Sequence, residues 1–159
     1  MKVIEKYAGA VNSTNLKDDE HHHNTDVLAA VALTTRLGSN LLRAKYAGIE
    51  ASTKPLMDDW KCIILKRAIR EGWTQFAEEV ALISLWYWLE PICETCKGRE
   101  HPKIPNTPML EMIVCPTCGG TGRKPLDCVA EIQAYVKDGV QQLEYMCYEA
   151  AQKANHKLR

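Results

Sequence analysis

Residues 76–96 read FAEEVALISLWYWLEPICETC, and this stretch contains the two features on which the fold depends. Its first two thirds are apolar at nearly every position, which is typical of a helix buried among other helices. Pro91 disfavours helical backbone at the residue before it, so we expect the helix to end there. Cys93 and Cys96 follow at once, and their spacing lets both sulfurs bind one side of a metal ion. The stretch therefore predicts a central helix that leads directly into a metal-binding segment.

Apolar residues at helical spacing predict further helices on both sides of this stretch. The expected segments are one from Thr25 that is interrupted by a turn at residues 38–40, one from Pro55 to Gly72, and a last one from Pro125 to about Asn155. Thr74 is the expected cap of the central helix. Only residues 109–114 indicate a strand. The predicted fold class is therefore mainly α.

A second cysteine pair, Cys115 and Cys118, follows the first after eighteen residues, and glycine follows each pair within two residues. Four such thiolates are typical of a structural Zn²⁺ site, because they fill the tetrahedron and leave no position open for a substrate. A redox-active pair is disfavoured, since a glycine turn rather than a helix follows each pair. Iron fits the same thiolate cage, and His101 could replace one ligand, although four cysteines suffice. We expect one structural zinc ion bound by Cys93, Cys96, Cys115 and Cys118, in a small four-cysteine zinc ribbon inserted at residues 91–125 of a helical bundle.

The expected organisation is a flexible polar leader at residues 1–24 and a single helical domain at residues 25–159 that carries the insert. The leader contains His21, His22 and His23, which either chelate a metal or belong to a solvated polar run. The charged start of the chain lacks the apolar core of a secretory signal, and no apolar run is long enough to span a membrane. We therefore expect an intracellular protein with reduced thiols.

Three cysteines remain outside the two pairs: Cys62, Cys128 and Cys147. All three fall within expected helices, so we expect them to be core thiols. The run Trp86-Tyr87-Trp88 places three aromatic residues side by side in the sequence. Consecutive helical residues point about 100° apart and cannot form one flat stacking surface. We therefore expect these rings to pack in the core rather than stack on nucleic-acid bases.

The chain has 20 Lys and Arg residues against 20 Asp and Glu residues, so it has no overall positive charge to attract nucleic acid. Contacts with phosphates must then come from local patches. A helix, a turn at residues 38–40 and a second helix bearing Arg43 and Lys45 fit a DNA-reading helix-turn-helix, and an ordinary bend in a core helix fits as well. The insert adds five cations against three carboxylates, which fits a nucleic-acid or polymerase contact or plain solvation. On charge and placement, the DNA-contact candidates are Arg36, Arg43, Lys45, Arg99, Arg123 and Lys124.

The order of these features resembles the lambda-type phage late-gene antitermination proteins, the Q family. The shared order is a polar leader, a helix starting Thr25-Asp26-Val27, a middle pair of helices, an apolar aromatic helix, two cysteine pairs with glycine, and a long C-terminal helix. The resemblance covers about residues 24–155, and the paired cysteines are its specific part. The second pair and its glycines also resemble the zinc units of DnaJ-type chaperones, but Glu100 stands where the first unit would have its last glycine.

The antitermination resemblance implies a non-enzymatic protein that binds double-stranded DNA beside the phage late promoter and acts on RNA polymerase paused there, so that terminators are read through. It also implies a zinc ion ligated by the four paired cysteines. The implied partner is bacterial RNA polymerase, alone or with its sigma factor, and the implied location is the cytoplasm of a bacterial host. A second hypothesis is a helical protein-binding adaptor, or a DnaJ-like co-chaperone module, with a structural zinc ribbon. No Ser/His/Asp, paired-carboxylate or phosphate-loop motif indicates an enzyme.

Overall fold

The computed structural model describes residues 4, 24–48, 52–107 and 109–157. The expected leader at residues 1–24, with its three histidines, lies outside these residues except at Ile4 and Asn24. Within the described residues the chain is mainly helical, as the apolar periodicity predicts, and its β pairing is limited to isolated bridges. None of the described helices is both long enough and apolar enough to cross a membrane.

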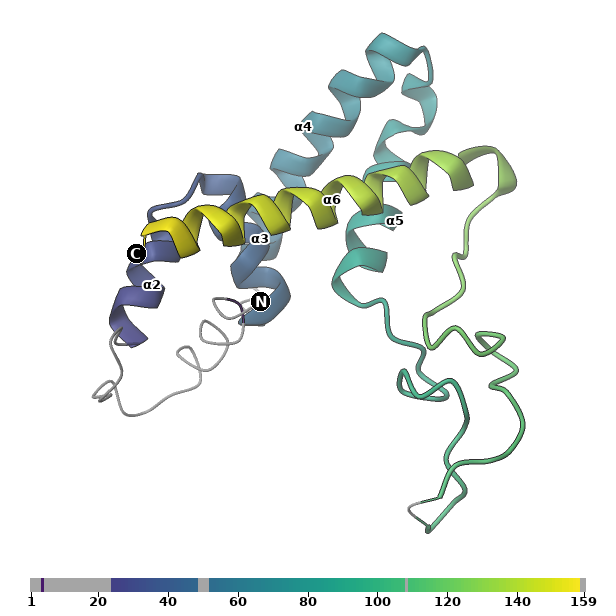
Figure 1. The fold of residues 1–159 in the computed structure, drawn as a ribbon. Helices are drawn as coiled ribbons and strands as arrows, with labels where there is room; N and C mark the ends of the chain where they lie inside the picture. Colours follow the sequence, from purple (N-terminus) through teal and green to yellow (C-terminus); the bar gives the residue numbers. More distant parts are fainter. Residues whose placement is uncertain (1–3, 5–23, 49–51, 108, 158–159) are drawn as a thin grey trace.

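The described helices lie along the chain in the order α2 (Asn24–Ala32), α3 (Arg36–Tyr46), α4 (Thr53–Glu71), the short 3-10 helix η2 (Thr74–Phe76), α5 (Ala77–Leu89) and α6 (Ala130–Lys157). α4 and α5 pack as neighbours, and α6 runs across α2, α3 and α5 (Figure 1). The chain between α5 and α6 projects away from the helices and then returns to them (Figure 1). The buried cysteines of this insert form a packing cluster of their own, separate from the helical core. The insert is therefore a distinct packing unit attached to the bundle.

The centre of the bundle is a layer in which α4, α5 and α6 meet. Trp60 of α4 is fully buried, and its indole Nε1 donates a hydrogen bond to Ser84 Oγ of α5 at 3.0 Å. Ser84 Oγ donates in turn to the carbonyl oxygen of Val80 at 2.6 Å, so the buried polar atoms of this layer have partners. A Cβ at Gly139 of α6 would lie 3.1 Å from Ser84 Oγ and 3.4 Å from the Trp60 ring. Glycine at this position therefore lets α6 approach the other two helices closely.

The expected turn at residues 38–40 is wrong. The chain turns at residues 33–35, and residues 38–40 belong to α3. Thr35 caps α3, because its side-chain oxygen accepts a hydrogen bond from the backbone N–H of Gly38 at 3.1 Å. Gly38 is needed for packing: a Cβ there would lie 2.8 Å from the Cβ of Ala150 in α6. The glycine therefore marks a close contact between helices and not a chain reversal.

Gly38→Ala is expected to destabilise the protein, although alanine is the better helix former by about 1 kcal/mol. The added methyl group collides with Ala150, and overpacking of this kind costs about 1–3 kcal/mol, which leaves a net loss of up to about 2 kcal/mol. Urea unfolding of Gly38→Ala, Ala150→Gly and the double variant measures the effect. The double variant should be more stable than the sum of the two single effects predicts. Strictly additive changes in the free energy of unfolding would show that contact with Ala150 is not what excludes a side chain at position 38.

Two helix starts also differ from expectation. Thr74 begins η2, which precedes α5, instead of capping α5 directly. α6 begins at Ala130 and not near Pro125. The backbone N–H of Lys124 donates to the carbonyl oxygen of Pro91 at 2.9 Å, which closes the base of the insert. Residues 125–129 connect this closed base of the insert to α6, so the helix begins only at Ala130.

The aromatic run on α5 divides between core and surface. Trp88 is buried, so core packing is confirmed there, but Trp86 is 51% exposed and the same prediction is wrong. Trp86 lines a hollow of about 690 Å³ together with Met57 and Leu82. The helical period alone explains this difference in exposure, because side chains two residues apart point about 200° apart around the helix.

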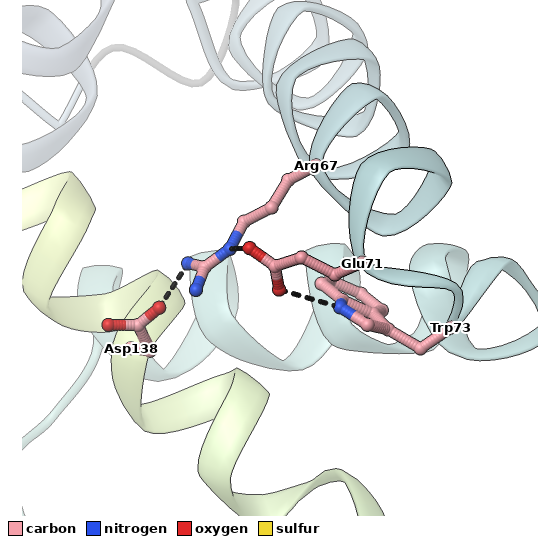
Figure 2. A network of polar contacts seen from close by, with 4 residues as sticks. All are labelled: Arg67, Glu71, Trp73 and Asp138. Carbon is pink, nitrogen blue, oxygen red and sulfur yellow. Dashed lines mark hydrogen bonds and ion pairs between the residues drawn. The ribbon is translucent and has the colours of Figure 1, made fainter.

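A polar network ties the end of α4 to α6 (Figure 2). Arg67 donates to Glu71 Oε1 at 2.8 Å and forms an ion pair with Asp138 of α6. Glu71 also accepts a hydrogen bond from the Trp73 indole at 2.8 Å, and this bond together with the Arg67 guanidinium lowers the pKa of the Glu71 carboxyl. The Trp73 ring stacks on Tyr135 of α6, with ring centroids 4.4 Å apart. The network therefore fixes the exit of α4 against α6.

Candidate metal centre and basic surfaces

The four paired cysteines come together within the insert. Their sulfur atoms all lie within 4.8 Å of one another. The Sγ atoms of Cys93 and Cys115 are 3.9 Å apart, and those of Cys96 and Cys118 are 3.7 Å apart. Such separations suit the corners of a tetrahedron with metal–sulfur bonds of about 2.3 Å. The cluster therefore has the donor set and the dimensions of a four-thiolate metal site.

Backbone N–H groups donate hydrogen bonds to the sulfurs of Cys93, Cys96 and Cys118, and each such bond favours the thiolate form. Hydrogen bonds from the N–H groups of Cys96 and Thr95 lower the pKa of Cys93. Burial opposes the ionisation of Cys118, yet hydrogen bonds led by the Gly122 N–H lower its pKa to about 6. Burial raises the pKa of Cys96. Donors of this kind fit a bound metal, because a ligating sulfur must be deprotonated and shares its charge with nearby amides.

The two cysteine pairs lie in turns that pack against each other. Gly98 and Gly122 have positive φ angles of 80° and 68°, a backbone conformation that favours glycine. A Cβ at Gly122 would lie 2.9 Å from the carbonyl oxygen of Gly98, so this approach requires glycine. The hydroxyl groups of Thr95 and Thr117 share a hydrogen bond of 2.8 Å between the two turns. Gly98, Gly119 and Gly120 all have positive φ angles, so the glycine turns predicted after the two cysteine pairs are confirmed.

Residues 109–114 do not form the expected strand of a zinc ribbon. In the described part of the insert, β pairing consists of two isolated bridges, Ile92 with Arg123 and Lys103 with Leu110. The backbone bends at residues 112 and 113, and the ring Nδ1 of His101 lies 2.9 Å from the carbonyl oxygen of Ile113. His101 therefore contacts backbone and lies outside the cysteine cluster. The bend interrupts strand pairing because the chain must turn here to bring Cys115 to the other sulfurs.

The cysteines outside the cluster follow expectation only in part. Cys147 is buried in the core, and burial raises the pKa of its thiol to about 11, so the core-thiol prediction is confirmed there. Cys62 is exposed, and the same prediction is wrong for it. The helical period of α4 turns Cys62 away from the face that buries Trp60 and Ile64. Cys128 is half-buried and precedes α6, so its predicted place on a helix is also wrong.

The six DNA-contact candidates lie in different environments, and three of them bind partners within the chain. Arg36 pairs with Asp59 at 3.3 Å, Lys124 pairs with Glu94 at 3.0 Å and Glu90 at 3.4 Å, and Lys45 donates to the carbonyl oxygen of Trp88. The Lys45 ammonium also lies 4.4 Å from the centroid of the Trp88 ring. Burial lowers the pKa of Lys45. Lys45 therefore stabilises the end of α5 and is poorly placed to reach a phosphate.

The other three candidates have freer side chains. Arg99 and Arg123 are exposed on the insert, and Arg43 is half-exposed in the last turn of α3. Arg123 is close enough to Lys45 for its charge to lower the pKa of Lys45 further. The structure thus brings one cation of the insert near the end of α3.

The outer face of α3 contains a polar residue that the sequence prediction missed. Arg36, Asn40 and Arg43 are spaced i, i+4 and i+7, so they share one face of the helix. The opposite face buries Gly38, Ser39, Leu41 and Leu42. The sequence prediction placed Asn40 in a turn. Thr35 was the signal that could have corrected it, because a threonine three residues before a glycine-containing turn can equally cap a helix.

No protein-family model, curated protein or solved structure matches this chain. The resemblance to antitermination proteins therefore rests on the order of the helices and the cysteine pairs.

Proposed function

We propose that this chain is a zinc-stabilised, non-enzymatic transcription antitermination factor that binds double-stranded DNA through α3 and bacterial RNA polymerase through a second surface. The observation that carries the DNA-binding half is the outer face of α3, formed by Arg36, Asn40 and Arg43. The antitermination half is supported by the order of helices and cysteine pairs, in which the chain resembles lambda-type late-gene antitermination proteins.

The outer face of α3 has the chemistry needed to read bases. α2, the turn at residues 33–35 and α3 have the order and turn length of a helix-turn-helix unit, whose second helix enters the major groove. Arginine can donate two hydrogen bonds to guanine, and asparagine pairs in the same way with adenine. The ion pair of Arg36 with Asp59 is exposed, so exchanging it for a base or phosphate contact costs little.

Zinc is the metal that we assign to the four clustered cysteines. A closed set of four thiolates at tetrahedral separations is typical of structural zinc. The apolar residues buried within the insert are cysteines themselves, so the insert has little other core to hold it together. Zinc binding supplies about 10–16 kcal/mol in comparable structural sites, which is enough to order a segment of this kind.

A neutral chain can act at DNA if a second partner holds it there. Local cations then need to supply only a small part of the binding free energy, because tethering to polymerase raises the effective concentration of the chain at its site. This supports a protein with two contact surfaces rather than one strongly basic surface.

Arg43→Ala is expected to weaken binding to the cognate duplex about 5–150-fold, which corresponds to the loss of one two-bond base contact worth about 1–3 kcal/mol. Fluorescence anisotropy with short duplexes tiled across the DNA that flanks the gene measures this. Lys137→Ala is the matched control, because it removes the same charge from an exposed position on α6. Equal weakening by both variants would mean that α3 does not read bases, and no binding at low salt would disprove the DNA-binding half.

Terminator read-through tests the antitermination half. Purified bacterial RNA polymerase, started at the promoter next to the bound duplex, should pass a downstream terminator more often when the protein is present. If polymerase stops equally often with and without the protein, the antitermination assignment is wrong, whatever the result of the DNA-binding measurement.

A further inference from the structure

We propose that the chain self-associates through the outer face of α4, which pairs antiparallel with the same face of a second copy. This face, the α4 seam, consists of Asp58, Cys62, Leu65 and Ile69. The pairing is independent of the proposed function, because it depends only on the exposure, spacing and charge of α4 residues.

The α4 seam lies on the side of the helix that faces away from the core. Leu65 and Ile69 are 46% and 63% exposed, and Asp58 and Cys62 are exposed as well. The opposite side of α4 supplies four residues to the core: Leu56, Trp60, Ile64 and Ala68. Single exposed apolar residues are ordinary, but a contiguous group on one helix marks an interaction surface.

The spacing of the α4 seam fits a second helix. Its positions follow one another at intervals of four, three and four residues, which keeps one stripe of a helix against a neighbouring helix. The four positions are also symmetric about their midpoint. In an antiparallel pair, Cys62 therefore lies opposite the second copy's Leu65, and Asp58 lies opposite the second copy's Ile69. A two-fold axis repeats both contacts, so the same face forms both sides of the interface.

Most charged residues of α4 already have partners within the chain. Asp59 pairs with Arg36, Lys61 pairs with Glu78, and Arg67 pairs with Glu71 and Asp138. Within the described part of the chain, four charged residues of α4 remain outside ion pairs: Lys54, Asp58, Lys66 and Arg70. Three of these can pair only with another molecule if they are to form an ion pair on the outer face.

The positions of these charges favour a second copy in the antiparallel arrangement. Asp58 of each copy then lies beside the second copy's Lys66 and Arg70, because these two cations flank the position opposite Asp58. A parallel pair would place Asp58 against Asp58 and Lys66 against Lys66, and such like-charge contacts are destabilising. Lys54 is about 120–160° away from Lys66 and Arg70 around the helix. A two-fold axis brings equivalent flanks together, so Lys54 stays apart from both cations.

Sedimentation equilibrium of the full zinc-loaded chain measures the dimer. One helix from each copy is a small contact beside the about 1,200–2,000 Å² that stable complexes bury, so we expect a reversible dimer with a micromolar dissociation constant. Leu65→Ser/Ile69→Ser should raise this constant at least about tenfold, because each copy loses two apolar side chains from the contact. Tyr145→Ser/Tyr148→Ser is the matched control, since it removes side chains that are 62% and 60% exposed from α6 and should leave the dimer intact.

Charge reversal tests the antiparallel register. Asp58→Lys and Lys66→Glu/Arg70→Glu should each weaken the dimer about tenfold or more, because each variant places like charges together. An equimolar mixture of the two variants should dimerise about as tightly as the wild type, since every reversed side chain then faces the opposite charge. Circular dichroism checks that each variant, changed only at exposed positions, stays folded.

Each contrary outcome rejects a stated part of the proposal. If the wild-type chain stays monomeric up to submillimolar concentration, self-association is wrong, and binding of that monomer to phosphatidylserine vesicles would assign the α4 seam to a membrane. If Leu65→Ser/Ile69→Ser dimerises as tightly as the wild type, or the α6 control loses the dimer as strongly, the contact lies elsewhere. A mixture of folded charge variants that fails to dimerise would show that the antiparallel register is wrong. No DNA or polymerase is present, so none of these results bears on the proposed function.

Discussion

Cys115→Ser is expected to abolish binding of the proposed zinc ion and unfold the insert while the helical bundle stays folded. Cys115 is fully buried in the cluster, and a serine oxygen is a poor replacement for the fourth thiolate. The loss removes most of the roughly 10–16 kcal/mol that a structural zinc site contributes. The bundle should survive, because its apolar core is separate from the cysteine cluster.

Metal analysis measures the loss of zinc, and hydrogen exchange measures the unfolding of the insert. Zinc content should fall from about one ion per chain to none, and amide protection should be lost between residues 93 and 123 but kept in α4, α5 and α6. Cys62→Ser is the matched control, since it replaces an exposed cysteine outside the cluster and should change neither reading. Retained zinc with a protected insert would show that the cluster does not bind the metal through Cys115.

The sequence predicts the parts of this fold that depend on neighbouring residues. Helical periodicity locates α4 and α5 to within a few residues. In α4 the apolar residues of one face recur about every 3.6 residues, and α5 is apolar at nearly every position. The cysteine cluster is predicted for the same reason: each pair and its glycine turn form a local unit, and two such units suit one ion. These features need no knowledge of how distant segments meet.

The features that the sequence mispredicts depend on distant segments. From the sequence alone, Gly38 indicates a turn. The structure shows that Gly38 packs against Ala150, and that Gly38 and Asn40 both belong to α3. Cys62 has apolar neighbours in sequence, but its side chain is exposed among the described residues. Residues 109–114 have the composition of a strand, yet in the described part of the insert they form one isolated bridge, Leu110 with Lys103. In the candidate site, the internal partners of Lys45 and Lys124 could not be predicted, because they lie far along the chain.

The central layer of the bundle gives the second large expected effect. Trp60→Ala should lower the free energy of unfolding by about 3–5 kcal/mol, because it empties a fully buried indole site that the packed helices cannot fill. It also leaves the Ser84 hydroxyl without its indole donor, although Ser84 still donates to Val80. Trp86→Ala on α5 is the matched control, with an expected change of at most about 1 kcal/mol, because that indole is 51% exposed.

Urea unfolding at fixed zinc concentration separates the parts of this effect. Ser84→Ala removes the acceptor of the Trp60 N–H and keeps the indole in place, so it should cost about 1–3 kcal/mol, less than Trp60→Ala. Gly139→Val should also destabilise, since its side chain would enter the space that Ser84 and the Trp60 ring occupy. If Trp60→Ala lowered the free energy of unfolding less than Trp86→Ala, the described packing of α4, α5 and α6 would be wrong, because α6 would not cover Trp60. The order Trp60→Ala, Ser84→Ala, Trp86→Ala therefore tests the packing of α6 independently of the metal.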